Sequence, residues 1–220
     1  MEKIIVFGNK ELAEIALFYL THDSDYQVAA FTVDSEYLTA DKFQGLPLVA
    51  FEQIQNFYPP EEYKMIIPLS YNNVNKVRAA KYQEAKAKGY KFISYVSSKA
   101  ITWPGLSIGE NCFIYEQNVI QPYVKIGNNV ILWSGNHIGH HSTIDDHCFL
   151  ASHIVVSGGV HIEPYCFIGV NATLRDHITI GTESVIGAGA LVMQDTKPRS
   201  VYGGQKSKEA KLSSDQLKRI

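Results

Sequence analysis

The sequence is poor in cysteine, in charge of one sign and in long apolar runs, and each shortage excludes a class of protein. Three cysteines among 220 residues are too few for a framework of disulfides, which indicates a reducing compartment. The 20 Lys and Arg residues nearly balance the 22 Asp and Glu residues, and a net charge of −2 gives no indication of a nucleic-acid or membrane partner. No apolar run approaches the roughly 18 residues of a membrane span, and residues 1–10 lack the pattern of a signal peptide. We therefore expect a cytoplasmic protein.

Residues 1–97 alternate between strand patterns and helix patterns. Strands are predicted at residues 3–8, 26–34, 64–70 and 91–96, and helices at residues 11–20 and 73–89. This alternation predicts a small parallel sheet of the Rossmann-like type, which binds ligands beyond the carboxyl ends of its strands. A ligand is therefore expected near residues 8–11, Asp34 and residues 69–75.

The glycine pattern of dinucleotide-binding folds is missing from the first strand–helix turn. Asn9, Lys10 and Glu11 follow Gly8, where further glycines would let a pyrophosphate approach the backbone. A nicotinamide cofactor is therefore not expected.

From about residue 100 the sequence repeats every six residues. Fifteen aliphatic residues lie six apart without interruption: Ile108, Ile114, Ile120, Ile126, Leu132, Ile138, Ile144, Leu150, Val156, Ile162, Ile168, Leu174, Ile180, Ile186 and Val192. Neither a helix nor a flat amphipathic strand has this period, whereas a parallel β-helix of hexapeptides does. Three hexads form one triangular coil of 18 residues, so about five coils are expected, stacked about 4.8 Å apart.

The position four residues after each aliphatic residue holds a small or modest side chain. All three cysteines, Cys112, Cys148 and Cys166, fall in this position. We expect both positions to point inward, so the cysteines are interpreted as small core residues. The change of pattern divides the chain into an α/β domain at residues 1–97, a β-helix domain at residues 98–196 and a tail at residues 197–220.

Four of the eight histidines fall within residues 138–155, which raises the question of a metal site. Residues 18 apart occupy equivalent places in successive coils, so His141, His147 and His153, which are six apart, lie on three different walls. One chain cannot bring them to one ion, and the His-x4-His pair of zinc carbonic anhydrases with this fold is absent. No metal is expected. His147, His153 and two further histidines, His161 and His177, are expected to be solvated or hydrogen-bonded residues of the scaffold.

An α/β unit followed by a hexapeptide β-helix resembles the bacterial sugar acyltransferases. The chain is most similar to acetyl-CoA-dependent N-acetyltransferases of nucleotide-linked amino sugars, of the bacillosamine and perosamine type, in a family with sialic acid O-acetyltransferase-like members. The resemblance is carried by residues 70–78 (SYNNVNKVR), 137–145 (HIGHHSTID) and 168–192. It implies a left-handed β-helix, a homotrimer with active sites at subunit interfaces, and a role in surface polysaccharide or lipopolysaccharide synthesis.

The resemblance also implies the catalytic residues. In similar enzymes the first residue of a His-Glu or His-His pair is catalytic, and that residue is His140 here, with His141 in the following, usually acidic, place. Histidine's ordinary pKa near 6.5 suits a base that accepts and releases a proton near neutrality. Gly158, one coil after His140, is expected to offer its N–H to the oxyanion or the thioester carbonyl. What orients His140 is left open between Asp145, Asp146 and an acidic residue of a neighbouring subunit.

Both substrates have expected contacts. Coenzyme A is expected to contact Gly158, Gly169, Ala172, Gly187, Ala188, Gly189 and, through its phosphates, Lys206. A dTDP-, UDP- or GDP-linked amino sugar is expected to contact Gly8, Asn9, Lys10, Asp34, Tyr71, Asn72, Asn75, Arg78 and Asn136. Asn72 also suits a simple helix-capping role.

The expected reaction is transfer of acetyl from acetyl-CoA to the amine of a nucleotide-linked 4-amino-deoxy sugar. Two alternatives remain at this point. The same histidine could activate a sugar or serine hydroxyl for O-acetylation, or the chain could be a non-catalytic scaffold that binds a sugar nucleotide.

Overall fold

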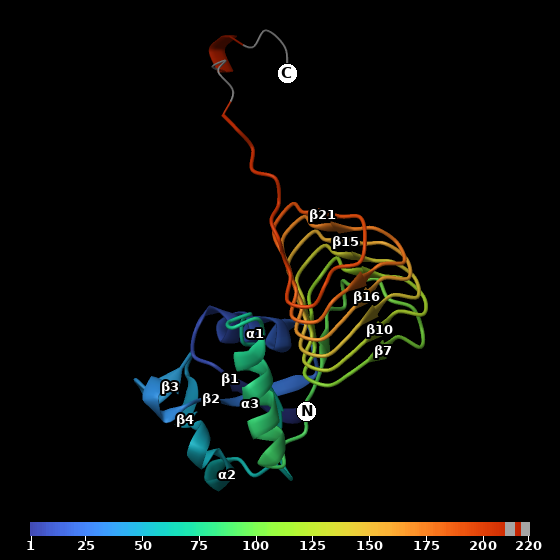
Figure 1. The fold of residues 1–220 in the computed structure, drawn as a ribbon. Coiled ribbons are helices and arrows are strands. Elements are labelled where there is room, and N and C mark those ends of the chain that lie inside the picture. The colour runs from blue at the N-terminus through green and yellow to red at the C-terminus, as the bar shows by residue number, and fades with distance from the viewer. Residues whose placement is uncertain (210–213, 217–220) are drawn as a thin grey trace.

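An α/β unit packs against one wall of a triangular β-helix in the computed structural model, which describes residues 1–209 and 214–216 (Figure 1). Residues 210–213 and 217–220 of the predicted tail lie outside the described residues.

The α/β unit contains the predicted small sheet. Its strands β1 (Glu2–Phe7), β2 (Tyr26–Val33), β4 (Leu46–Ala50) and β5 (Lys64–Ile66) run parallel, and β3 (Lys42–Phe43) pairs antiparallel with β4. The strand order is β3-β4-β2-β1-β5. Because β1 pairs with β2 on one side and with β5 on the other, the order reverses at β1, and the ligand crevice of such sheets forms at the carboxyl ends beside that reversal.

Helices cover the sheet. The helical segments of the α/β unit are α1 (Glu11–His22), η1 (Ser35–Tyr37), η2 (Phe51–Gln53), α2 (Ile54–Phe57) and α3 (Lys76–Ala87). A further segment, η3 (Ser214–Gln216), lies in the tail, away from the sheet (Figure 1). α1 buries Ala13, Ala16 and Leu20 against the sheet. Within the described part of the chain, every helix is too short or too polar to cross a membrane.

Three predicted elements differ from the structure. The strand predicted at residues 64–70 ends at Ile66. The helix predicted at residues 73–89 begins only at Lys76, because Asn73, Val74 and Asn75 have φ values of 51°, 49° and 65° in the left-handed region. The strand predicted at residues 91–96 is not part of the α/β sheet beyond a bridge from Phe92 to Met65.

The β-helix has three walls of parallel strands. The β6 wall consists of β6 (Tyr95–Val96), β8 (Phe113–Ile114), β11 (Ile131–Leu132), β14 (Phe149–Leu150), β17 (Phe167–Ile168), β20 (Val185–Ile186) and β22 (Val201–Tyr202). The β7 wall consists of β7 (Ser107–Ile108), β10 (Lys125–Ile126), β13 (Thr143–Ile144), β16 (His161–Ile162) and β19 (Thr179–Ile180). The β9 wall consists of β9 (Val119–Ile120), β12 (His137–Ile138), β15 (Val155–Val156), β18 (Thr173–Leu174) and β21 (Leu191–Val192).

Neighbouring coils pair residues that are 18 apart, such as His137 with Val155, which confirms the predicted coil length. The division at residues 1–97, 98–196 and 197–220 stays a proposal. β6 lies before its first boundary and β22 after its second, yet both pair with strands of the β-helix.

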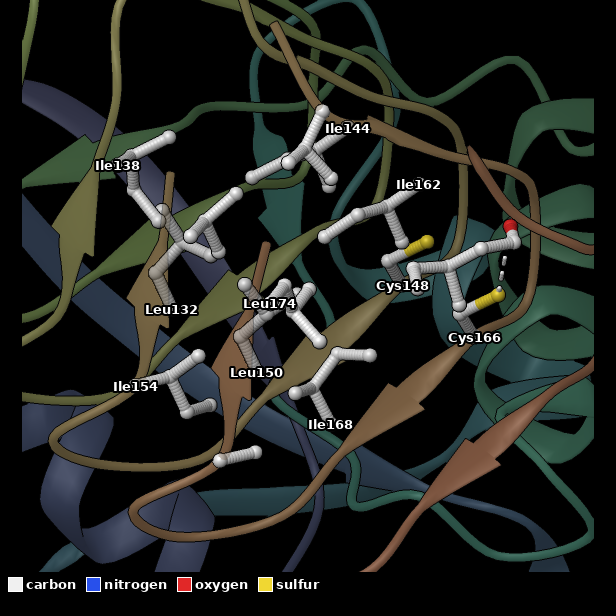
Figure 2. Close-up of a cluster of buried hydrophobic side chains, with 14 of the residues drawn as sticks. Leu132, Ile138, Ile144, Cys148, Leu150, Ile154, Ile162, Cys166, Ile168 and Leu174 are labelled. Carbon is white, nitrogen blue, oxygen red and sulfur yellow. Dashed lines mark hydrogen bonds between the residues drawn. The ribbon is translucent and has the colours of Figure 1, made fainter. Parts of the chain in front are cut away.

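The inside of the β-helix is filled by the two residue sets that the six-residue pattern predicted to point inward (Figure 2). The aliphatic residues from Ile114 to Val192 are buried, and Ile108 packs partly buried against them in the first coil. Cys112, Cys148 and Cys166 are also buried, and their Sγ atoms contact backbone carbonyls. Burial raises the pKa of the Cys112 thiol to about 11, so the cysteines are core residues as predicted.

One residue in each hexad, at the corner between two walls, has a left-handed backbone. These residues are Gly105, Asn111, Gln117, Tyr123, Asn129, Gly135, His141, His147, His153, Gly159, Tyr165, Asn171, His177, Glu183 and Gly189. Four of the eight histidines therefore occupy corners on different coils, where each ring packs over the corner residue of a neighbouring coil. His161 lies on β16 and not at a corner.

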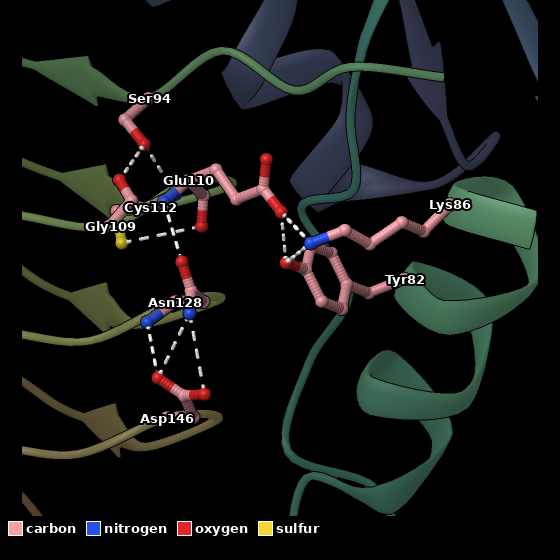
Figure 3. A network of polar contacts seen from close by, with 8 residues as sticks. All are labelled: Tyr82, Lys86, Ser94, Gly109, Glu110, Cys112, Asn128 and Asp146. Atoms are coloured by element: carbon pink, nitrogen blue, oxygen red, sulfur yellow. Dashed lines mark hydrogen bonds and ion pairs between the residues drawn. The ribbon is translucent and has the colours of Figure 1, made fainter. Parts of the chain in front are cut away.

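The α/β unit covers the outer face of the β6 wall. Aromatic residues of that wall, including Phe113 and Phe149, pack with α1 and the sheet in one apolar cluster. Tyr82 and Lys86 of α3 both bond to Glu110 at a β-helix corner (Figure 3). The two units therefore share both an apolar and a polar interface.

Arg78 of α3 is fully buried in this interface. Its guanidinium donates to the carbonyl oxygens of Leu69, Ser70, Asn129, His147 and Cys148 and to the side-chain oxygens of Asn75 and Asn129, at 3.0–3.3 Å. Burial lowers its pKa to about 10, so the group stays charged at neutral pH. Arg78 thus joins the α/β unit to two coils of the β-helix.

Candidate active site

His140 and His141 lie in the exposed turn between β12 and β13, on the edge where the β9 wall meets the β7 wall. The His140 N–H donates to Gln121 Oε1 at 2.8 Å, and the His140 carbonyl accepts the Gly159 N–H at 2.8 Å. The backbone that carries His140 is therefore held from the coil below and from the coil above.

The ring of His140 lies against Gly158 in the next coil. A Cβ added to Gly158 would lie only 2.7 Å from Nε2 and Cε1 of the ring, so any other residue would collide with it. Within the described residues the Gly158 N–H donates no hydrogen bond. The equivalent N–H groups of His140 and Asn128 do have oxygen acceptors. The Gly158 N–H is therefore free beside the edge of an imidazole, and its role as a donor to an oxyanion stays a prediction.

His141 contacts His140 directly. The two Nδ1 atoms are 3.1 Å apart, and the rings are nearly perpendicular at 86°. The His141 ring also packs on the ring of Tyr123 one coil below, with centroids 4.7 Å apart. His141 has φ 60°, as a corner residue.

The two aspartates considered as partners of His140 are engaged elsewhere. Asp145 Oδ2 lies 2.7 Å from Nε2 of His161. Asp146 accepts the backbone N–H of Asn128 at 2.6 Å and its side-chain amide at 3.3 Å (Figure 3). Neither aspartate orients His140 within this chain.

A hollow of about 390 Å³ lies on the same edge directly below the histidine pair. Trp103, Leu106, Gln121 and Tyr123 line it. Trp103 and Tyr123 are both more than half exposed, so the edge offers aromatic and amide surface next to His140. A hollow of about 600 Å³ at the amino ends of the α/β strands, beside Glu2, does not match the ligand-binding edge of a parallel sheet.

The predicted acceptor residues Gly8, Asn9, Lys10, Asp34, Tyr71 and Asn72 follow the carboxyl ends of β1, β2 and β5. Gly8 has φ 127°, and Asn9 Nδ2 donates to the Tyr37 carbonyl at 3.0 Å. Asp34 lies 2.9 Å from Lys81 Nζ, a pair that the sequence pattern did not indicate. Tyr71 is half exposed and packs on Phe149 and Phe167 of the β6 wall.

Three other predicted acceptor residues are buried in structural roles, which corrects the expectation. Asn75 donates to the carbonyls of Tyr165 and Cys166, and Arg78 is enclosed as described above. Asn136 is one of the inward residues of the six-residue pattern, and its Oδ1 accepts the Ile154 N–H at 2.8 Å. None of the three has a side chain exposed to a ligand.

The predicted coenzyme A residues are divided among different places. Only Gly158 lies on the edge of His140. Gly169, Gly187, Ala188 and Gly189 lie on the edge between the β6 wall and the β9 wall, and Lys206 is exposed in the tail. Ala172 points into the β-helix interior and is fully buried, so its predicted contact with coenzyme A is wrong.

Gln121 and Tyr123 belong to the site but were not among the predicted residues. Tyr123 follows from the 18-residue coil, since it stands one coil below His141, whereas the contact of Gln121 with the His140 N–H does not follow from it. Where the chain is described, no cluster of three or more His, Cys, Asp or Glu side chains has the arrangement of a metal site.

The profile of the family described as bacterial transferase hexapeptide (six repeats) matches residues 105–140 and 159–194. A search of curated protein sequences gives no match.

Solved structures match over almost the whole chain. A histidine-to-asparagine variant of perosamine N-acetyltransferase from Caulobacter crescentus, in complex with CoA and GDP-perosamine, is 19% identical with a TM-score of 0.82, covering 93% of this chain and 94% of that one. The acetyltransferase domain of PglB from Neisseria gonorrhoeae is 20% identical with a TM-score of 0.61, covering 93% and 97%. WeeI from Acinetobacter baumannii is 17% identical with a TM-score of 0.64, covering 91% and 96%.

These likenesses confirm the predicted fold, an α/β unit followed by a left-handed hexapeptide β-helix. One of these structures is a perosamine N-acetyltransferase, the type of enzyme that the sequence motifs resemble, and the likeness is one of fold. At identities of 17–20% the solved structures establish only the architecture of this chain. The chemistry of the site depends on the residues of this chain.

Proposed function

We propose that the chain is an acetyl-CoA-dependent N-acetyltransferase that acts on the amine of a nucleotide-linked 4-amino-deoxy sugar, with His140 as general base. The observation that carries this proposal is the contact of the His140 ring with Gly158, whose N–H has no partner in the described part of the chain. The likeness to a perosamine N-acetyltransferase that binds CoA and GDP-perosamine supports the substrate class.

In the proposed reaction the amine nitrogen attacks the acetyl carbonyl carbon, the C–S bond breaks, and coenzyme A leaves as its thiolate. His140 accepts the proton of the amine at Nε2 and delivers it to the thiolate. The N–H of Gly158 stabilises the oxyanion of the tetrahedral intermediate. No other cofactor or metal is needed for this balance.

The position of the α/β unit supports a site shared between copies of the chain. That unit covers the β6 wall, whereas His140 lies on the edge between the other two walls, on the opposite side of the triangle. A sugar nucleotide held at the carboxyl ends of β1, β2 and β5 would lie on the side of the β-helix away from His140 of the same chain. We propose a homotrimer in which the acceptor of one copy reaches His140 of the next.

The same reasoning applies to coenzyme A. Gly158 lies beside His140, but Gly169, Gly187, Ala188 and Gly189 lie on another edge. One acetyl-CoA that contacts both sets lies between two copies, with Lys206 of the tail available for its phosphates. The proposal places the enzyme in the cytoplasm, in synthesis of a surface polysaccharide such as lipopolysaccharide, without a membrane or nucleic-acid partner.

The test is a substrate screen. The purified chain is incubated with acetyl-CoA and dTDP-, UDP- or GDP-linked 4-amino-deoxy sugars, with the matching 4-hydroxy sugars and free serine as controls, and release of coenzyme A is followed. We expect release with an aminated nucleotide sugar and at least about 100-fold less with His140→Asn. Release with the hydroxylated controls would favour O-acetylation, and release with no compound would contradict an acetyltransferase.

A further inference from the structure

We propose that His141 replaces the usual acidic partner of the catalytic histidine, so that the base of this site is a hydrogen-bonded pair of neutral imidazoles. The inference rests on the proposed function and concerns how His140 is held in the tautomer that can accept a proton. The observation behind it is the 3.1 Å distance between Nδ1 of His140 and Nδ1 of His141.

No acidic group competes for this role within the described residues. Asp145 is paired with His161, and Asp146 with Asn128. No other carboxylate of the described chain hydrogen-bonds to either ring.

The turns packed above and below the pair add no charge next to it. The turn below presents Gln121 and Tyr123, and the coil above presents Gly158 and Gly159. One coil further up, Arg175 Nε lies 3.8 Å from Asp176 Oδ1, and the ring of His177 lies over Gly159. Among the described residues, His141 is the ionisable side chain that hydrogen-bonds to the His140 ring.

The structure holds the partner ring in place. His141 occupies a corner with φ 60°, and its backbone N–H donates to the Pro122 carbonyl at 3.2 Å. Its ring packs on the ring of Tyr123. Corner residues with aromatic rings, such as Tyr123 and Tyr165, recur on this β-helix, so the stacking itself is a property of the scaffold. The Nδ1–Nδ1 contact is specific to the pair.

The hydrogen bond between two Nδ1 atoms fixes the roles of the four ring nitrogens. One Nδ1 carries the hydrogen and the other offers its lone pair. If His140 donates, its Nε2 keeps a free lone pair beside Gly158 and can accept the proton of the amine. If His141 donated, Nε2 of His140 would carry hydrogen and could not act as a base. Catalysis therefore uses the state in which His140 donates and His141 accepts.

The consequence is a characteristic response to pH. A carboxylate partner would stabilise the imidazolium formed at His140 by its charge, whereas the neutral His141 stabilises it only through a hydrogen bond. Replacing His141 by glutamate should therefore keep the orientation and make His140 easier to protonate. The acid limb of kcat/KM against pH should then move to higher pH.

The test compares pH profiles of kcat/KM for the wild type, His141→Glu, His141→Gln and His141→Phe, using the aminated sugar found in the screen. His141→Phe keeps a ring over Tyr123 but removes the acceptor, and we expect about a 10- to 100-fold loss. His141→Gln restores an acceptor and should lose less. His141→Glu should remain active with its acid limb about 1 pH unit higher.

His153→Phe is the matched control at another corner, where the His153 ring lies over Gly135. This variant should leave the pH profile of kcat/KM unchanged.

Two results would overturn the inference in an active, folded enzyme. One is a His141→Phe variant with wild-type kcat/KM at every pH, and the other is a His141→Glu variant whose acid limb stays in place. A wild-type chain that releases no coenzyme A would instead contradict the proposed function, so the two failures are distinguishable.

Discussion

The corner position of each hexad has a positive φ, and its occupants decide what the histidines do. His147 and His153 lie at corners on two different edges, apart from the edge that carries His140 and His141. Among the described residues, two imidazoles meet beside an unpartnered backbone N–H only on the edge of His140 and His141. Residues 138–155 are therefore rich in histidine for two reasons. Corner positions accept polar rings, and His140 and His141 form the proposed catalytic pair.

The close approach of Gly158 to His140 gives a prediction at the same scale. In Gly158→Ala the new Cβ would lie 2.7 Å from the His140 ring, which has to move away. We expect kcat/KM to fall by about 100-fold, since displaced catalytic groups cost rates of this order. The control is Gly203→Ala, because a Cβ there meets nothing within 4 Å. Equal activity of the two variants would contradict the proposed placement of His140.

His147 gives a prediction about stability and pH. Its Nδ1 accepts the Asn129 amide at 2.8 Å, its carbonyl accepts from Arg78, and it is only 6% exposed. Burial lowers the pKa of His147, so the unfolded chain takes up its proton first as pH falls. The folded state then loses up to about 1.4 kcal/mol per pH unit below about pH 6.5.

The measurement is the free energy of unfolding by urea between pH 5.5 and 8. In His147→Asn, which places at this corner the residue found at Asn111 and Asn129 of the same column, we expect a flatter dependence below pH 6.5. His153→Asn, at an exposed corner, should keep the wild-type slope. An unchanged slope in His147→Asn would assign the pH dependence to other groups.

At the scale of elements, α3 is fixed to the β-helix by one buried cation. Arg78 reaches carbonyls on both sides of the interface, and within the described residues no carboxylate pairs with it. Arg78→Met would leave several buried carbonyl oxygens without donors, each of which costs about 1–3 kcal/mol. We expect a loss of at least about 3 kcal/mol in the free energy of unfolding.

Lys76 on the same helix supplies the matched control. Its exposed ion pair with Glu183 at 2.8 Å is worth at most about 1 kcal/mol, so Lys76→Met should change stability little. Similar losses in both variants, measured by urea unfolding, would contradict the role given to Arg78.

The β-helix could be predicted from sequence almost residue by residue, whereas the start of α3 could not. A six-residue period follows directly from the geometry of a flat wall and a corner, so every inward position was identified. The left-handed turn at Asn73, Val74 and Asn75 includes a β-branched residue, which local preferences disfavour. The burial of Arg78 is equally hidden, because its partners are backbone carbonyls of segments far away in the sequence.

At the scale of the whole molecule, the face used for docking could have been predicted but the site could not. The aromatic residues Phe113, Phe149 and Phe167 recur at outward positions 18 or 36 residues apart, which marks the β6 wall as covered. Nothing in the periodicity places Gln121 beneath the His140 backbone or pairs the two imidazoles. Those contacts depend on how far each side chain extends across a corner of the β-helix.

The α/β unit and His140 lie on opposite sides of the β-helix. We therefore propose that each active site is built from two copies of the chain. The most direct measurement mixes two variants, His140→Asn and Asp34→Lys, which reverses the charge at the acceptor edge. Each variant alone should be nearly inactive, while its trimer stays assembled.

Random mixing of equal amounts, by refolding together, gives each site about one chance in four of an intact His140 and an intact acceptor edge from different chains. We expect recovery of about a quarter of the wild-type rate of coenzyme A release. If the mixture stays as inactive as its components although hybrid trimers form, each site lies within one chain, which would contradict a site shared between two copies.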